Sequence, residues 1–73
     1  MYKEKQTLRI LLKHFIDEDD RWMIKGTLAD IARSYGYYGE SAGRVLRKMA
    51  REGIILNKII RNGRENLVWY KKL

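Results

Sequence analysis

The sequence predicts one α+β domain, mainly helical, in which three helices are followed by a C-terminal β-hairpin. Three observations predict this fold class. A length of 73 residues suits a single domain over 1–73, apolar residues recur at helical spacing in three segments, and two runs rich in β-branched and aromatic residues follow. We expect helices at about residues 2–17, 28–35 and 40–52, and a hairpin at about 54–72.

The first helix is predicted by a single apolar stripe. Its members recur three and four residues apart, and they are Leu8, Leu11, Leu12, Phe15 and Ile16. Ile10 lies opposite the stripe and is the one residue that indicates a homodimer contact through this helix. His14 falls on the same outward side and is expected to be solvated. The four acids at 17–20 oppose the helix dipole, so the helix is expected to end there.

A short connection and a second helix come next. Residues 22–26 are mostly apolar and are interpreted as a connection with one short strand. Thr27 and Asp30 have the spacing of a capping box, which predicts that Thr27 opens the helix. The expected buried face consists of Leu28, Ile31, Ala32 and Tyr35. Gly36 is expected to end the helix in a left-handed conformation.

The third helix has the most pronounced pattern in the chain. At 100° per residue, its core side is formed by Ala42, Val45, Leu46 and Met49. The opposite side carries Glu40, Arg44, Arg47 and Arg51 within about 60° of arc, flanked by Gly43 and Lys48. Gly53 is expected to end this helix. One face therefore belongs to the core and the other is a stripe of arginines.

The hairpin is expected to have a tip of four residues. The Asn62-Gly63 pair by itself favours a two-residue turn, but that register sets Ile60 opposite Glu65. A four-residue tip instead pairs Ile60 with Leu67 and Ile59 with Val68, which matches apolar side chains with one another. Trp69, in the second strand, is expected to anchor the hairpin to the core.

The charge distribution indicates a polyanionic partner. The chain has 16 Lys and Arg against 9 Asp and Glu, a net charge of +7, and a sequence pI near 9.9. Residues 1–37 carry seven basic and six acidic side chains, whereas residues 38–73 carry nine basic and three acidic ones. Nearly all the excess positive charge therefore lies in the half of the chain that contains the third helix and the hairpin.

Other classes of protein are disfavoured by composition. There is no cysteine and one histidine, so we expect no catalytic residues, no metal site and no cofactor. No apolar run approaches the roughly 18 residues of a membrane span, and no basic-then-apolar leader is present, so we expect no membrane partner. The expected location is the cytoplasm, in association with the nucleoid, or the host cytoplasm for a viral protein.

Together these features resemble the winged helix-turn-helix superfamily of DNA-binding domains. The resemblance is carried by segment 27–32, Gly36, segment 43–55 and Val68-Trp69-Tyr70, and it covers roughly residues 8–73. It implies binding of double-stranded DNA by a small transcriptional regulator, of an archaeal or viral type. In that family the third helix lies in the major groove, and the hairpin, called the wing, contacts the backbone or the minor groove.

Ten residues are expected to bind DNA: Tyr38, Ser41, Gly43, Arg44, Arg47, Lys48, Arg51, Lys58, Arg61 and Arg64. Arg44 and Arg47 are candidates for base readout, because a guanidinium group pairs with guanine O6 and N7. Gly43 allows close approach of the helix backbone. The remaining basic residues suit phosphates, and the two arginines of the hairpin tip also suit the minor groove. Tyr37 and Tyr38 suit hydrogen bonds to phosphates, and the alternative is that at least one of them packs on the second helix.

Two alternatives remain. Winged helices that bind Z-form nucleic acid resemble Arg44-Val45-Leu46 and Val68-Trp69-Tyr70, but this chain has Gly43 and Arg47 where they have asparagine and tyrosine, and it lacks their prolines. The other alternative is a protein-interaction winged helix in a replication or transcription complex. In that case the basic stripe meets an acidic protein surface.

Overall fold

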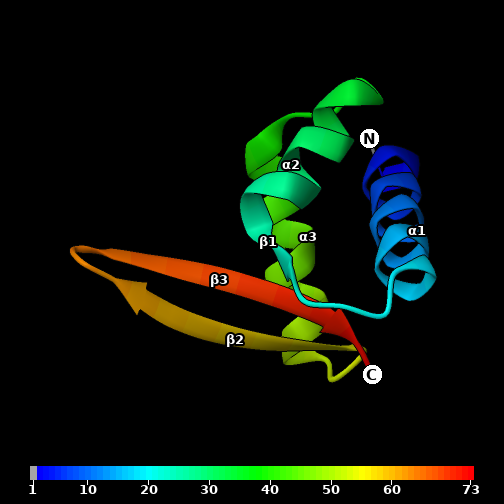
Figure 1. The fold of residues 1–73 in the computed structure, drawn as a ribbon. Helices are drawn as coiled ribbons and strands as arrows, with labels where there is room; N and C mark the ends of the chain where they lie inside the picture. Colours follow the sequence, from blue (N-terminus) through cyan, green and yellow to red (C-terminus); the bar gives the residue numbers. More distant parts are fainter. Residues whose placement is uncertain (1) are drawn as a thin grey trace.

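The computed structural model describes residues 2–73, with side chains described from Thr7 onward. Its elements are, in order, α1 (Tyr2–Glu18), β1 (Met23–Ile24), α2 (Lys25–Ser34), α3 (Gly39–Arg51), β2 (Ile55–Asn62) and β3 (Glu65–Lys72). The strands form one antiparallel sheet in the order β1-β3-β2. Three helices on one side of a hairpin that projects beyond them give a winged-helix layout (Figure 1), so the predicted fold class is confirmed.

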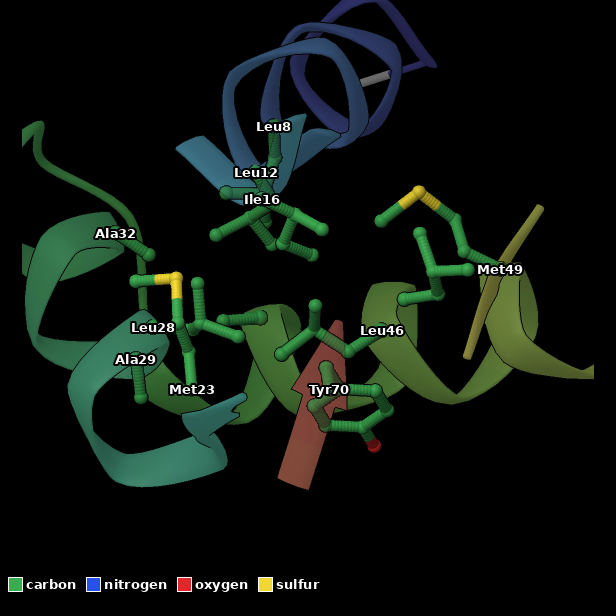
Figure 2. Close-up of a cluster of buried hydrophobic side chains, with 12 residues drawn as sticks. Leu8, Leu12, Ile16, Met23, Leu28, Ala29, Ala32, Leu46, Met49 and Tyr70 are labelled. Carbon is green, nitrogen blue, oxygen red and sulfur yellow. The ribbon is translucent and has the colours of Figure 1, made fainter. Parts of the chain in front are cut away.

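The core lies between the three helices and the proximal part of the sheet (Figure 2). From the predicted stripe of α1, Leu8, Leu12 and Ile16 are fully buried, whereas Leu11 and Phe15 lie half-buried at its margin. Burial of one such aliphatic side chain contributes about 1.5–3 kcal/mol. Ile10 and His14 are exposed, as the stripe predicts. Within the described residues, no helix combines the length and the apolar character needed to cross a bilayer.

The prediction that Thr27 caps α2 is wrong. The helix begins three residues earlier than expected, at Lys25, and Ile24 takes the N-cap position with extended backbone and no side-chain capping bond. The cause is a contact between residues far apart in the sequence. Because Ile24 also belongs to β1, where it pairs with Trp69 of β3, the sheet determines where the helix begins. Asp30 instead pairs with Arg33 at 2.5 Å.

The end of α2 follows the prediction for Gly36 but not for Tyr35. Gly36 has a φ of +91°, and the N–H groups of Gly36 and Tyr37 donate to the carbonyls of Arg33 and Ala32, both at 3.0 Å. These two bonds form a Schellman motif. Tyr35 lies at the C-cap, beyond the last helical residue, so its side chain leaves the periodic face and is exposed. Ala29 is buried together with the predicted Leu28 and Ala32, whereas the predicted Ile31 is half-buried.

The helix α3 is shifted by one residue from the predicted 40–52. Ala42, Leu46 and Met49 are fully buried, and Val45 packs against them from a half-buried position. Gly53 has a φ of +78°, and the N–H of Ile54 donates to the carbonyl of Met49 at 3.0 Å, which is a second Schellman motif. The core face and the end of this helix therefore agree with the prediction.

The hairpin has the predicted register but a tighter turn. Ile60 pairs with Leu67 and Ile59 with Val68, as expected. The strands continue to Asn62 and Glu65, so only Gly63 and Arg64 form the turn, and the four-residue tip is wrong. Gly63 has a φ of +64°, whereas the φ of Arg64 is negative. A glycine at the first of two turn positions is typical of a II′ turn, whose twist suits a hairpin.

Alternation along the strands gives the sheet two distinct faces. The inner face, toward the helices, carries Ile55, Asn57, Ile59, Arg61, Asn66, Val68, Tyr70 and Lys72. The outer face carries Leu56, Lys58, Ile60, Asn62, Glu65, Leu67, Trp69 and Lys71. Tyr70 is buried in the core, so it anchors the hairpin in place of Trp69. The prediction that Trp69 anchors the hairpin is wrong, because Trp69 lies on the outer face of the sheet and Tyr70 on the inner face.

Candidate nucleic-acid interface

The side of α3 opposite the core presents four exposed cations, Arg44, Arg47, Lys48 and Arg51. We call these residues the basic stripe. The helix positions them because Ala42, Leu46 and Met49 fix its other side in the core. Residues of one helix face are held in register by the helix itself, so the spacing of these cations is determined by the fold.

The basic stripe lacks carboxylate partners among the described side chains. The carboxylates that do form ion pairs bind cations elsewhere, namely Arg9, Lys13, Arg21, Arg33 and Lys71. Glu52, just after α3, pairs with Arg9 of α1 at 2.6 Å rather than with Arg51. The positive charge of the stripe is therefore left for a partner outside the chain.

A groove of about 340 Å³ runs along one flank of the basic stripe, between α3, the start of α2 and the inner face of the hairpin. Its cations are Lys25, Arg47 and Arg51, and none of the acidic side chains that the structure describes lines it. Ala50, Ile59, Val68 and the ring of Tyr70 supply apolar surface, and Asn57 supplies an amide. Arg44 and Lys48 do not line this groove and lie toward the other flank of the stripe.

Tyr70 connects the groove to the core. Its hydroxyl oxygen points away from the buried side chains in Figure 2, and its side chain lines the groove. Burial raises the pKa of the Tyr70 hydroxyl, and the positive charge of Arg47 opposes that rise. Because the pKa lies above its ordinary value of 10.0, the hydroxyl is neutral at physiological pH and leaves the charge of the groove to its three cations.

Gly43 lies on α3 without a steric need for glycine inside the chain. A Cβ built at this position meets only the Cδ atom of Lys25, at 3.9 Å, which is ordinary van der Waals contact. Glycine in a helix interior costs about 0.5–1 kcal/mol relative to alanine. Ser41 is half-buried beside it, and Glu40 is exposed in the first turn. The missing side chain at Gly43 therefore serves no packing purpose that the fold reveals.

The tyrosines before α3 take different positions. Tyr37 packs against the core, in line with the alternative that at least one of the pair packs inward, whereas Tyr38 is 80% exposed at the N-cap of α3. Of the residues predicted in the hairpin, Arg61 lies on the inner face and Arg64 in the turn, both exposed. Tyr38 and the tip arginines are therefore exposed to a partner that covers α3.

Lys58 is separated from the other predicted residues. It lies on the outer face of the sheet, and its Nζ atom is 4.3 Å from the centre of the Trp22 ring. Lys25 and Asn57, in contrast, were not predicted and line the groove. Lys25 was missed because the start of α2 was placed after it. Side chains two positions apart in a strand lie on the same face. Because Ile55 is buried, this alternation would have placed Asn57 on the inner face.

No cluster of three potential metal ligands occurs among the described side chains. Comparisons with protein-family models, with curated proteins and with solved structures gave no match.

Proposed function

We propose that the chain is a winged helix-turn-helix protein that binds double-stranded DNA sequence-specifically, as a small transcriptional regulator. The observation that supports this proposal is the basic stripe of α3, which has no carboxylate partner among the described residues and adjoins a groove lined by Lys25, Arg47 and Arg51. Phosphates are bound by such unpaired guanidinium and ammonium groups through charge-assisted hydrogen bonds.

In the proposed complex α3 enters the major groove, which is about 12 Å wide and admits one helix. Arg44, near the N-terminal half of α3 and outside the groove beside the hairpin, is the candidate for reading guanine. Arg47 and Arg51 line that groove together with Lys25 and are better suited to hold a phosphodiester strand. Arg61 and Arg64 extend the contact along the hairpin. Regulation follows from occupancy of a promoter, with no chemical step.

The experiment is fluorescence anisotropy of a labelled random-sequence duplex, titrated with protein at several salt concentrations. If about six basic side chains meet phosphates, log K falls with log salt at a slope near −5 per protomer. The double variant Arg44→Ala, Arg47→Ala is expected to weaken binding and to reduce the magnitude of that slope by about 1 for each lost phosphate contact.

A matched control separates specific contacts from net charge. The double variant Lys13→Ala, Arg21→Ala removes the same two positive charges from positions outside the stripe, where each cation already pairs with an aspartate. It is expected to bind nearly as tightly as the unaltered protein. If the two double variants lose affinity for DNA equally, binding depends on net charge alone, and the assignment of the interface is contradicted. An absence of binding at low salt would refute DNA binding and leave an acidic protein surface as the partner.

Specificity has its own test. A site selected from random duplexes should be discriminated by Arg44, because one bidentate arginine–guanine pair contributes about 1–3 kcal/mol. Arg44→Ala is therefore expected to relax the preference at one base pair, whereas Arg51→Ala lowers affinity for all sequences alike. If selection enriches no sequence, binding is nonspecific and the regulator proposal fails while the DNA-binding proposal stands.

A further inference from the structure

The strand β2 has an open edge. It is the outer strand of the sheet, paired with β3 along all eight of its residues, and no other strand of the described chain lies on its far side. The pairing with β3 advances residue for residue from Ile55–Lys72 to Asn62–Glu65, so no bulge interrupts it. The sequence also has no proline. Bulges and prolines are common means by which monomeric proteins block an edge strand.

The side chains of this edge are unusually apolar for a strand in water. Among the described side chains, seven large hydrophobic ones are exposed, and three of them belong to β2: Leu56, Ile59 and Ile60. They occur on both faces of the strand, since Ile59 is on the inner face and the other two are on the outer face. A long, regular and apolar edge is a template for pairing with another strand.

The two cations of β2 are directed away from the edge. The Nζ atom of Lys58 lies over the ring of Trp22, which precedes β1 and is therefore on the far side of β3. The Nε atom of Arg61 donates to the carbonyl oxygen of Gly63, toward the turn, at 3.4 Å. A lysine on an edge strand normally discourages pairing. Here the one lysine of the strand reaches across the sheet instead.

We propose that β2 pairs antiparallel with β2 of a second copy of this chain, about a two-fold axis normal to the sheet and centred on Ile59. Such an axis sets each residue opposite one on the same face. A register centred on Lys58 would place that lysine opposite its own copy, and like charges directly opposite are destabilising. The register centred on Ile59 pairs Ile59 with itself, Lys58 with Ile60 and Asn57 with Arg61, so no like charges meet.

This pairing joins two three-stranded sheets into one continuous sheet. Because the axis is normal to the sheet, the helices of both copies remain on the same side. The pairing does not depend on the proposed DNA binding, and it differs from a contact through Ile10 of α1. Edge pairing alone buries less than the roughly 1,600 Å² of a standard interface, so we expect a dissociation constant of about 10–100 µM.

The test measures molar mass by sedimentation equilibrium from about 5 µM to about 1 mM, a range chosen to bracket that constant. Ile59→Lys places two lysines opposite each other across the axis, and it is expected to weaken dimerisation at least about tenfold. Ile10→Lys is the matched control, because Ile10 is 69% exposed and Ile59 is 63% exposed. Both side chains are exposed, so both changes are expected to leave the fold intact, and the control is expected to dimerise normally.

Amide hydrogen exchange of the unaltered protein gives a second measurement that needs no variant. The N–H groups of β2 that do not donate to β3 are expected to exchange more slowly at 1 mM than at 5 µM, with a rate that falls about in proportion to the monomeric fraction. A monomer throughout the range, a dimer that survives Ile59→Lys, a dimer that Ile10→Lys disrupts, or edge amides whose exchange is independent of concentration would each overturn the proposal.

Discussion

Replacement of Gly43 by alanine should stabilise the protein and weaken its binding to DNA. The Cβ that the change adds meets only the Cδ atom of Lys25, at 3.9 Å, so no packing cost is expected. Alanine in a helix interior is more favourable than glycine by about 0.5–1 kcal/mol. For a domain of this size that gain corresponds to a rise of about 2–8 °C in the midpoint of thermal unfolding.

The effect on binding should have the opposite sign. Gly43 flanks the basic stripe near the N-terminal half of α3, where the proposed complex brings the helix backbone closest to the bases. A methyl group at that point holds the helix away from the base edges, and we expect a loss of about tenfold in affinity, or about 1.4 kcal/mol. Circular dichroism melting and anisotropy titration measure the two effects on the same sample.

Gly26→Ala is the matched control. Gly26 lies in α2, has open space where its Cβ would stand, and is outside the basic stripe. This variant should also gain stability but keep full affinity. A destabilised Gly43→Ala would refute the packing argument, and an unchanged affinity would refute the placement of Gly43 against the DNA.

Three other predictions follow from the core, a helix end and a titrating group. Leu46→Ala removes a fully buried side chain and should lower the free energy of unfolding by about 2–5 kcal/mol. That is a large part of the roughly 4–11 kcal/mol expected for a chain of this length. Urea unfolding measures the loss, and a value below about 1 kcal/mol would contradict the placement of Leu46 in the core. Gly53→Ala forces a Cβ onto a φ of +78° and should cost about 1–2 kcal/mol in the same assay. Because burial raises the pKa of Tyr70, its folded form holds the proton more tightly, so stability should fall as the pH rises above 10.0 through the folded pKa. Tyr70→Phe should remove that alkaline loss, whereas Tyr38→Phe, at an exposed position, should leave it unchanged.

The predictions from sequence succeeded where local signals agreed with each other. The helix α3 was located to within one residue because its apolar face, its arginine stripe and Gly53 all indicate the same element. The register of the hairpin was also predictable, since pairing Ile60 with Leu67 and Ile59 with Val68 matches apolar side chains, whereas the turn that Asn62-Gly63 favours sets Ile60 opposite Glu65. In both cases the information lies within about 20 residues of chain.

The failures concern positions that depend on distant partners. The start of α2 is determined by pairing of Ile24 with Trp69, 45 positions away in sequence, and no local pattern reveals that pairing. The same error hid Lys25 from the candidate site. Trp69 and Tyr70 are neighbours in a strand, so one must face inward and the other outward. The sequence favours the larger ring as the anchor, whereas packing in the helical core selects Tyr70.

The position of Tyr70 also has a mechanical consequence. On β3 it is the last buried residue on the path from the core to the turn of the hairpin, and Arg64 lies six positions before it in the sequence. At about 3.3 Å per residue, the hairpin extends about 20 Å from Tyr70 to its turn. A rotation of about 5° at Tyr70 carries the turn through about 2 Å, while the buried side chains of α1 and α3 keep their places. The tip can thus follow a surface of varying width without disturbing the packing that holds α3 in position.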